Sequence, residues 1–166
     1  WGTFASSFRS SGLRWKETLS PWSGGRLVAG LDVESIDGDV SGPHVGAPVG
    51  TPFGFGQAGS ASIPTFRVTS PYVGVDHRIA LGSRWTLQPA AGLRHYSSNH
   101  YDAKTAPNVG VSLYDASVKF YANYALGLLY PGAETYTLTS AIPMAFAANN
   151  GWDRLSASEN RHKEIG

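Results

Sequence analysis

The sequence predicts an all-β protein, an antiparallel up-and-down meander of about seven long strands that forms part of a transmembrane β-barrel. Three observations support this prediction. Apolar and polar residues alternate through long stretches, which is the period of a β-strand. No long window has apolar residues three and four apart with capping residues at both ends, so no long helix is expected. Short and long connections between the alternating stretches follow one another along the chain.

The first half of the chain contains three expected strands. Segment 3–17 is rich in Ser and Arg and alternates least clearly. Segment 25–37 places Leu27 and every second residue up to Val33 on one apolar face. Segment 66–80 places valines and an isoleucine opposite Tyr, Gly, Asp and Arg. The period of two in the last two segments predicts strands with one apolar face.

The second half contains the clearest strand. Segments 85–99 and 105–114 alternate, and a final strand is expected over 160–166. Segment 118–132, VKFYANYALGLLYPG, keeps an apolar face from Val118 onward in steps of two, against a mixed face of Lys, Tyr, Asn, Ala, Gly and Leu. A typical globular strand has about 5–6 residues. A strand that crosses the hydrocarbon of a membrane needs about 9–11 residues, so this length favours a membrane barrel.

Alternation assigns the side chains to two faces of the expected sheet. The apolar face should turn outward to lipid, and it holds Val73, Val75, Ile79, Leu87, Ala91, Leu93, Val109, Val111, Phe120, Ala122, Leu126 and Leu128. The opposite, concave face should turn toward the lumen, and it holds Arg94, Lys119 and Asn123.

The connections differ in length in a regular way. Short ones are expected at 20–25, 81–84 and 114–117, a medium one at 100–104, and long ones at 38–65 and 131–159. In a meander, all the short turns then lie at one end and the long loops at the other, as in outer-membrane barrels. Aromatic residues at the ends of such strands form girdles at the two membrane interfaces. Trp22, Trp85 and Tyr114 are expected in the inner girdle and Tyr130 in the outer one.

Composition limits the other possibilities. The chain starts at Trp1 without a signal peptide and stops after a strand-like segment, which we interpret as one partial barrel domain over 1–166, truncated at both ends. A net charge of +1 does not indicate nucleic-acid binding. The absence of Cys excludes disulfides and thiolate metal sites. No apolar run approaches the ~20 residues of a membrane helix, so a membrane role requires strands.

Several segments, in this order and spacing, resemble the barrel of TonB-dependent outer-membrane receptors. They are GRLVAGLDVES, YVGVDHRIALGSRWTLQPAAGLRHY, APNVGVSLYDASVKFYANYALGLLYPG and ENRHKEIG. The last is similar to an E-x-x-x-x-E-x-G strand opening, matched by Glu159, Glu164 and Gly166. The resemblance covers nearly the whole chain.

This resemblance implies a 22-stranded barrel in the outer membrane of a Gram-negative bacterium. Its partners would be outer-membrane lipid, the rest of the barrel, an N-terminal plug and the energising TonB complex, and its solute a metal chelate such as an iron–siderophore. The plug, the TonB box and the terminal strand are missing from residues 1–166.

The candidate solute-contacting residues fall into two sets. The lumenal set, which could line the solute path or contact the plug, is Arg94, Tyr96, Lys119, Tyr121, Asn123, His162 and Glu164. The alternative for each is that it hydrates the lumen or pairs across strands. The second set consists of aromatic residues in the long outer loops, namely Phe53, Phe55, Tyr136, Phe146 and Trp152. Aromatics beside polar groups suit a bulky, partly apolar ligand such as a metal chelate.

Other chemistry lacks a complete motif. GFGQAG at 54–59 matches a dinucleotide-binding pattern in letters, but no helix is expected after it. His95, His100 and Asp102 do not form a closed metal-ligand set. We therefore expect no enzyme activity, no cofactor and no metal site. Two other interpretations stay open: a different outer-membrane β-barrel, such as an adhesin or autotransporter pore, and a soluble all-β binding module.

Overall fold

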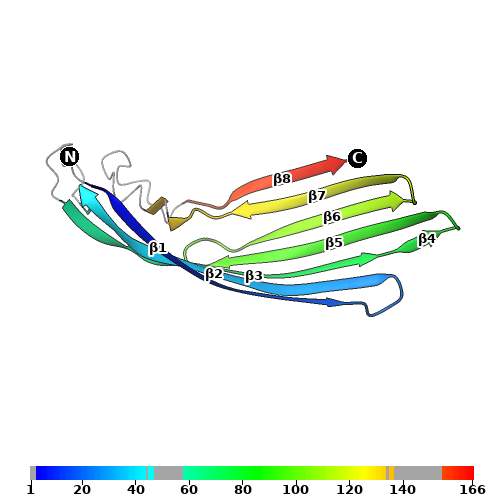
Figure 1. The fold of residues 1–166 in the computed structure, drawn as a ribbon, viewed down its shortest axis with the longest axis horizontal. Coiled ribbons are helices and arrows are strands. Elements are labelled where there is room, and N and C mark those ends of the chain that lie inside the picture. The colour runs from blue at the N-terminus through cyan, green and yellow to red at the C-terminus, as the bar shows by residue number, and fades with distance from the viewer. Residues whose placement is uncertain (1–2, 44, 47–57, 134, 137–154) are drawn as a thin grey trace.

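The protein is a single antiparallel meander in one open sheet (Figure 1). The computed structural model describes residues 3–43, 45–46, 58–133, 135–136 and 155–166. The strands are β1 (Ala5–Leu19), β2 (Gly25–Pro43), β3 (Ala58–His77), β4 (Ile79–Leu81), β5 (Trp85–Ser98), β6 (Lys104–Tyr114), β7 (Lys119–Leu129) and β8 (Ser158–Ile165). Their order in the sheet is β1-β2-β3-β5-β6-β7-β8, with β4 also paired to β5. The expected all-β meander is confirmed.

The number of strands agrees with the prediction, and the strands are long, as expected. Seven strands follow one another across the sheet, and the three-residue β4 continues β3 after a break at Arg78. β2 has 19 residues and β3 has 20, several times the usual ~5–6. Among the residues that the structure describes, no helix is long and apolar enough to cross a membrane.

Tight turns join the strands at one end of the sheet. Gly24 and Gly82 have φ values of 76° and 69°, a left-handed conformation that glycine adopts without steric cost. At the third turn the Asp115 carboxylate accepts hydrogen bonds from the backbone N–H groups of Ser117 (2.7 Å) and Val118 (2.9 Å). These three turns lie at the right in Figure 1, and the connections that follow β2, β5 and β7 leave the sheet at the left. The expected alternation of connections is therefore confirmed.

The connection expected at 38–65 is shorter than predicted. Gly38 to Pro43 and Ala58 to Ile63 are paired strand residues, so the strands continue well beyond the predicted boundary. A register shift between Ile36 and Gly38 marks the place where the alternation becomes irregular. Backbone hydrogen bonds between strands form whether or not apolar residues alternate. The sequence there is rich in Gly and Pro and lacks this alternation, so the sequence alone predicted a loop.

The strand register places apolar side chains on one face, here called the apolar face. Val73 is paired with Leu93, and Val75 with Ala91, which is paired in turn with Val109. Partners in an antiparallel pair share a face, so the predicted grouping of these residues is confirmed. Six large members of this face are between 40% and 55% exposed, namely Val73, Val75, Leu93, Val109, Val111 and Phe120.

The two faces exchange character in the part of β1, β2 and β3 that is farthest from the tight turns. Beyond Ser35, the continuation of the apolar face is polar: Arg9 approaches Asp37 at 3.9 Å, and the Ser62 hydroxyl donates to the Asp39 carboxylate at 2.9 Å. The opposite face instead carries the small buried core, which consists of Val40, Val45, Ile63, Phe66, Tyr101 and Ala133. The apolar face is therefore a band of limited height, and not a property of the whole strand length.

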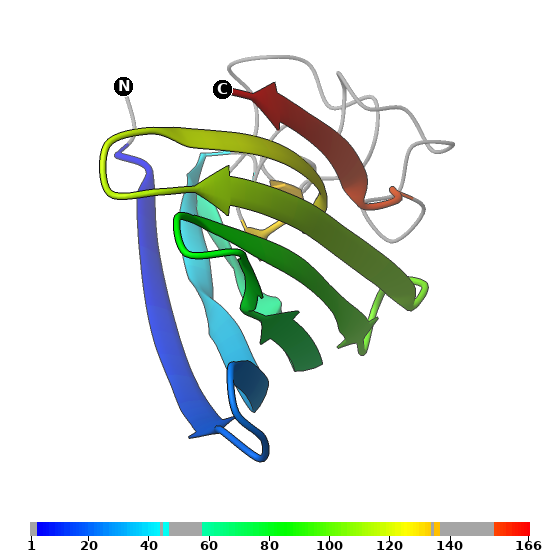
Figure 2. The same cartoon turned by 90° about the vertical axis from the view of Figure 1, so that its right-hand side faces the viewer.

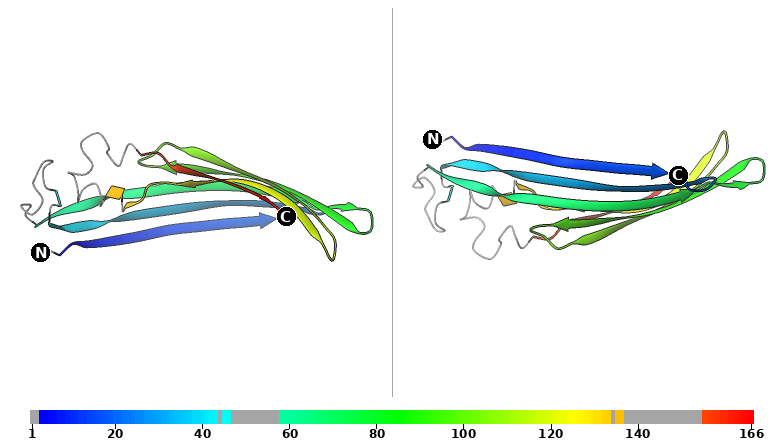
Figure 3. Two further views of the ribbon diagram at one scale, coloured as in Figure 1. Left: turned by 90° about the horizontal axis from the view of Figure 1, so that it is seen from above. Right: turned by 90° about the horizontal axis from the view of Figure 1, so that it is seen from below.

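The sheet is curved and does not close. The end-on view shows the strands arranged as a gutter, with β1 and β8 as its two edges (Figure 2). The long strands also bow along their length (Figure 3). Curvature gives the sheet a hollow side, which carries the candidate site.

Candidate ligand-binding cleft

The face opposite the apolar band, here called the polar face, gathers charged and tyrosine side chains from five strands. They come from neighbouring register positions of β1, β2, β3, β5 and β6. Arg14 is paired with Asp32, Asp32 with Ser70, and Tyr72 with Arg94. Alternation in each strand thus aligns polar groups that are far apart in the sequence.

Arg94 is the centre of this face. Its Nη1 lies 2.7 Å from Oδ2 of Asp32, and the two side chains are 32% and 24% exposed. Its guanidinium carbon lies 4.4 Å from the ring centre of Tyr72 and 5.8 Å from that of Tyr96. Stacking and ion pairing hold the guanidinium in place across β3. The remaining N–H groups of Arg94 can donate to a ligand, because a guanidinium has five.

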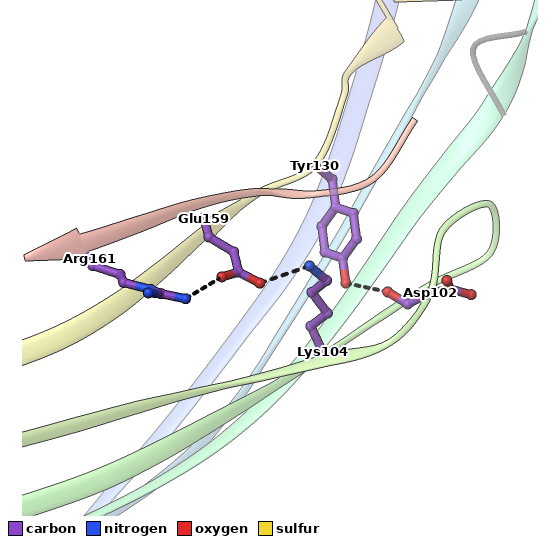
Figure 4. Close-up of polar contacts among 5 residues, drawn as sticks. All are labelled: Asp102, Lys104, Tyr130, Glu159 and Arg161. Atoms are coloured by element: carbon purple, nitrogen blue, oxygen red, sulfur yellow. Dashed lines mark hydrogen bonds and ion pairs between the residues drawn. The ribbon is translucent and has the colours of Figure 1, made fainter. Parts of the chain in front are cut away.

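Three tyrosine rings lie at the end of the polar face opposite the tight turns. Tyr130 lies against Tyr101 with ring centres 5.6 Å apart, and against Tyr96 at 6.3 Å. Its hydroxyl donates to the backbone oxygen of Asp102 at 2.9 Å (Figure 4). Burial raises the pKa of Tyr130 above its ordinary value, so the phenol keeps the proton that it donates.

The position of Tyr130 corrects one prediction. It was expected in an outer aromatic girdle, but it follows the end of β7 at Leu129 and turns toward Tyr96 and Tyr101. Once β7 ends, strand alternation no longer dictates the direction of the side chain, and ring packing decides it.

These groups surround a hollow of about 800 Å³. Its lining includes Arg14, Asp32, Glu34, Arg94, Tyr96 and Tyr130. This size is typical of sites for small molecules, which bury an apolar body against aromatic rings and orient it with a few polar groups. Both charge signs are present, so the hollow offers donors and acceptors.

The other predicted lumenal residues form a second group on β7 and β8. The Tyr121 hydroxyl donates to Oε1 of Glu164 at 2.8 Å, and Nε2 of His162 lies 3.6 Å from Oε2. Lys119 lies with its Nζ 5.7 Å from the Tyr121 ring centre. Asn123 is paired with Glu164 in the β7–β8 register. The structure thus separates the seven predicted residues: Arg94 and Tyr96 line the hollow, and the remaining five lie together on β7 and β8, outside its lining.

A third polar group lies near the tight turns and was not predicted. Oδ2 of Asp76 accepts from Nε of Arg26 at 2.7 Å, and Oδ1 accepts from Nε2 of Gln88 at 2.8 Å. The Tyr114 hydroxyl donates to Oε1 of Gln88 at 3.3 Å. This corrects the prediction that Tyr114 belongs to the inner girdle, because it points to the polar face. Alternation indicated the face of these residues, but only the register brings four strands' side chains together.

The predicted outer-loop aromatics are only partly covered by the structure. Tyr136 packs against the buried core of the outer region. Phe53, Phe55, Phe146 and Trp152 lie outside the described residues. Within the described part of the chain, no group of His, Asp and Glu is arranged to hold a metal ion.

Comparison with protein-family models, with curated proteins and with solved structures finds no match to this chain.

Proposed function

We propose that this chain forms part of the barrel wall of a TonB-dependent outer-membrane receptor. Such a receptor would import a scarce solute, such as an iron–siderophore, into a Gram-negative bacterium. The apolar face would contact outer-membrane lipid, and the polar face would line the lumen and contact an N-terminal plug that engages TonB.

The observation that carries the proposal is the bounded apolar band on the exposed face. A large exposed apolar surface marks contact with a membrane or with another protein. Its replacement by Arg9, Asp37 and Asp39 beyond Ser35 is what strands that project from a membrane into water require.

The turn end of the band supports the same proposal. The Trp85 and Phe120 rings stack with their centres 6.4 Å apart, beside the tight turns. Aromatic residues at this level form the interfacial girdle of outer-membrane barrels. From Trp85 to Leu93, β5 keeps alternate apolar residues over a length that agrees with the ~9–11 residues of a spanning strand.

The two open edges favour a larger barrel. β1 and β8 each have one partner among the described strands, and lipid offers no hydrogen-bonding groups to the other side. Additional strands of the same receptor would satisfy both edges. The hollow around Arg94, together with the long outer connections, would then receive the solute.

The test is production of the complete receptor in a Gram-negative host, with and without a functional TonB complex. We expect the chain in the outer-membrane fraction, as a band whose gel migration changes on heating, and TonB-dependent uptake of a radiolabelled ferric chelate. Insertion without TonB-dependent uptake would favour an adhesin or autotransporter pore. Recovery of a folded chain in the soluble fraction would favour a binding module and refute the proposal.

A further inference from the structure

The hollow on the polar face contains two opposite charges that the described residues leave without a partner. Arg14 on β1 and Glu34 on β2 both line it. Neither side chain forms a hydrogen bond or an ion pair with a residue that the structure describes. The other two charged residues of the lining, Asp32 and Arg94, are paired with each other at 2.7 Å. The hollow therefore offers one guanidinium and one carboxylate to a ligand.

The strand register explains why Arg14 is unpaired. Its cross-strand partner is Asp32, and opposite charges at such positions usually attract each other. The Asp32 carboxylate instead extends across β3, where its register partner is the small Ser70, and reaches Arg94 on β5. The Arg94 guanidinium is held there by the Tyr72 ring, 4.4 Å away. Asp32 is thus engaged elsewhere, and the donors of Arg14 are left for a ligand.

Glu34 is unpaired for a different reason. Its cross-strand partners are Gly12 on β1 and Val68 on β3. Glycine has no side chain and the valine side chain has no polar atom, so neither can donate to the carboxylate. Arg14 lies diagonally across from Glu34, and such positions are about 7–8 Å apart. A single ligand can therefore contact both side chains.

The part of the hollow away from β1 and β2 suits an apolar body. Phe66, Tyr96 and Tyr130 line it there. The rings of Tyr96 and Tyr130 lie with their centres 6.3 Å apart. Aromatic rings in such an arrangement offer broad apolar surfaces and further ring-stacking positions. A volume of about 800 Å³ accommodates a charged end of the ligand beside β1 and an apolar body beside these rings.

We propose that the hollow binds a solute with a zwitterionic end, in which an ammonium group and a carboxylate lie close together as in an amino-acid unit, attached to an apolar or aromatic body. This inference rests on the proposed function and narrows its class of solute. Glu34 accepts hydrogen bonds from the ammonium group, and Arg14 donates hydrogen bonds to the carboxylate. A solute with only one of these charges leaves the other side chain desolvated and unpaired, which weakens binding.

The test compares four ferric chelates built on one trihydroxamate. The first carries an amino-acid unit with a free ammonium group and a free carboxylate. The second has the amine acetylated, the third has the carboxylate esterified, and the fourth has both changes. Their dissociation constants for the complete receptor in detergent are measured by quenching of protein fluorescence. We expect the zwitterionic chelate to bind about tenfold or more tighter than each singly blocked form, because each block removes charge-assisted hydrogen bonds.

Single variants then assign each charge to its side chain. E34Q should remove the advantage of the free ammonium group, and R14Q should remove the advantage of the free carboxylate, while the other preference is kept in each case. Lys16→Gln and Glu17→Gln are the controls, because these two residues of β1 carry the same kinds of charge and do not line the hollow. Both control variants should bind the four chelates as the wild type does.

The inference would be overturned by equal affinities for the four chelates, by no binding of any of them, or by preferences that persist in E34Q and R14Q. An equal loss of preference in the control variants would overturn it as well, because overall charge and not contact would then explain the selectivity. Uptake that depends on TonB but shows no preference would refute only the zwitterion site. Selective binding without uptake that depends on TonB would refute only the transport role.

Discussion

At the scale of single residues, the environment of a side chain depends on whether its position along the strand places it on the apolar or on the polar face. Asn108 and Val109 are neighbours in β6, yet Asn108 is paired with Gly92 on the polar face and Val109 with Ala91 on the apolar face. The same substitution at these two positions therefore tests the assignment of the faces directly. The central position of Val109 in the band also makes it more sensitive than Phe120, which stacks on Trp85 at the turn end.

We predict that Val109→Arg lowers the stability of the inserted receptor by about 2–4 kcal/mol, the cost of Arg near the middle of a bilayer. Phe120→Arg should cost only about 0–1 kcal/mol, because Phe120 would lie at the membrane interface of the proposed receptor. The measurement is urea unfolding of the receptor in lipid vesicles, with Asn108→Arg as the control. A larger loss for Asn108→Arg than for Val109→Arg would mean that the faces are assigned the wrong way round.

The Arg94–Asp32 pair leads to a second prediction. Both side chains are largely shielded from solvent, so this ion pair should contribute more free energy to stability than an exposed pair does. A double-mutant cycle with Arg94→Gln and Asp32→Asn should give a coupling energy of about 1–3 kcal/mol. The exposed pair of Arg9 and Asp37 serves as the control, with an expected coupling of about 0–1 kcal/mol. Equal coupling energies in the two cycles would contradict this account of the polar face.

At the scale of elements, side-chain bonds connect two neighbouring tight turns, in addition to the bonds within each turn. Nε of Arg84, in the turn before β5, donates to Oδ2 of Asp115 at 2.7 Å. Asp115 also closes its own turn through the N–H groups of Ser117 and Val118. One carboxylate therefore links two adjacent hairpins.

This arrangement predicts a pH effect. The backbone hydrogen bond from Ser117, the Arg84 bond and the Val118 bond lower the pKa of Asp115 below its ordinary value of 3.8. Its ionised form thus stabilises the fold above that value, and the contribution is lost as the pH falls through the lowered pKa.

Thermal unfolding of the inserted receptor between pH 7 and pH 3 measures this contribution. Asp115→Asn should lower the unfolding temperature at neutral pH, and the difference from the wild type should shrink in acid. Asp102→Asn is the control, because the Asp102 carboxylate forms no hydrogen bond with the described residues. A difference for Asp115→Asn that stays constant down to pH 3 would show that its ionisation does not stabilise the turn.

At the scale of the whole molecule, the buried core and the tyrosine cluster lie at the end of the sheet opposite the tight turns, where the long connections leave it. Tyr136 is packed against the core, so the chain after β7 is anchored up to that residue. The outer loops were predicted to capture the solute because binding residues concentrate on loops that a rigid scaffold holds.

We predict that deletion of 137–152 in the complete receptor abolishes binding and uptake of its ligand while the barrel stays folded and inserted. The deletion removes the candidate ligand residues Phe146 and Trp152 and keeps Tyr136. Uptake of a labelled ligand is measured together with heat-modifiable gel migration. Normal uptake would refute the role of this loop, and loss of the folded band would mean that the loop is structural.

The sequence by itself determined the strands, the alternation of their faces and the order of short and long connections. These are local properties, because the direction of each side chain follows from its parity in an extended chain. Strand ends were less predictable. Gly38 to Pro43 lack apolar alternation and were assigned to a loop, although the backbone there pairs with β3.

Only the tertiary structure decided which residues meet. Asp32 and Arg94 are far apart in the chain and lie in strands that are not direct neighbours, so their ion pair depends on the registers of β2, β3 and β5 together. The same holds for Tyr130, whose direction is set by Tyr96 and Tyr101 after β7 ends. Alternation with a period of two shows which face of the sheet a residue occupies. The register between two strands decides which residues are partners, and a shift in register moves every partner along the strand. The sequence of a single strand does not contain the register.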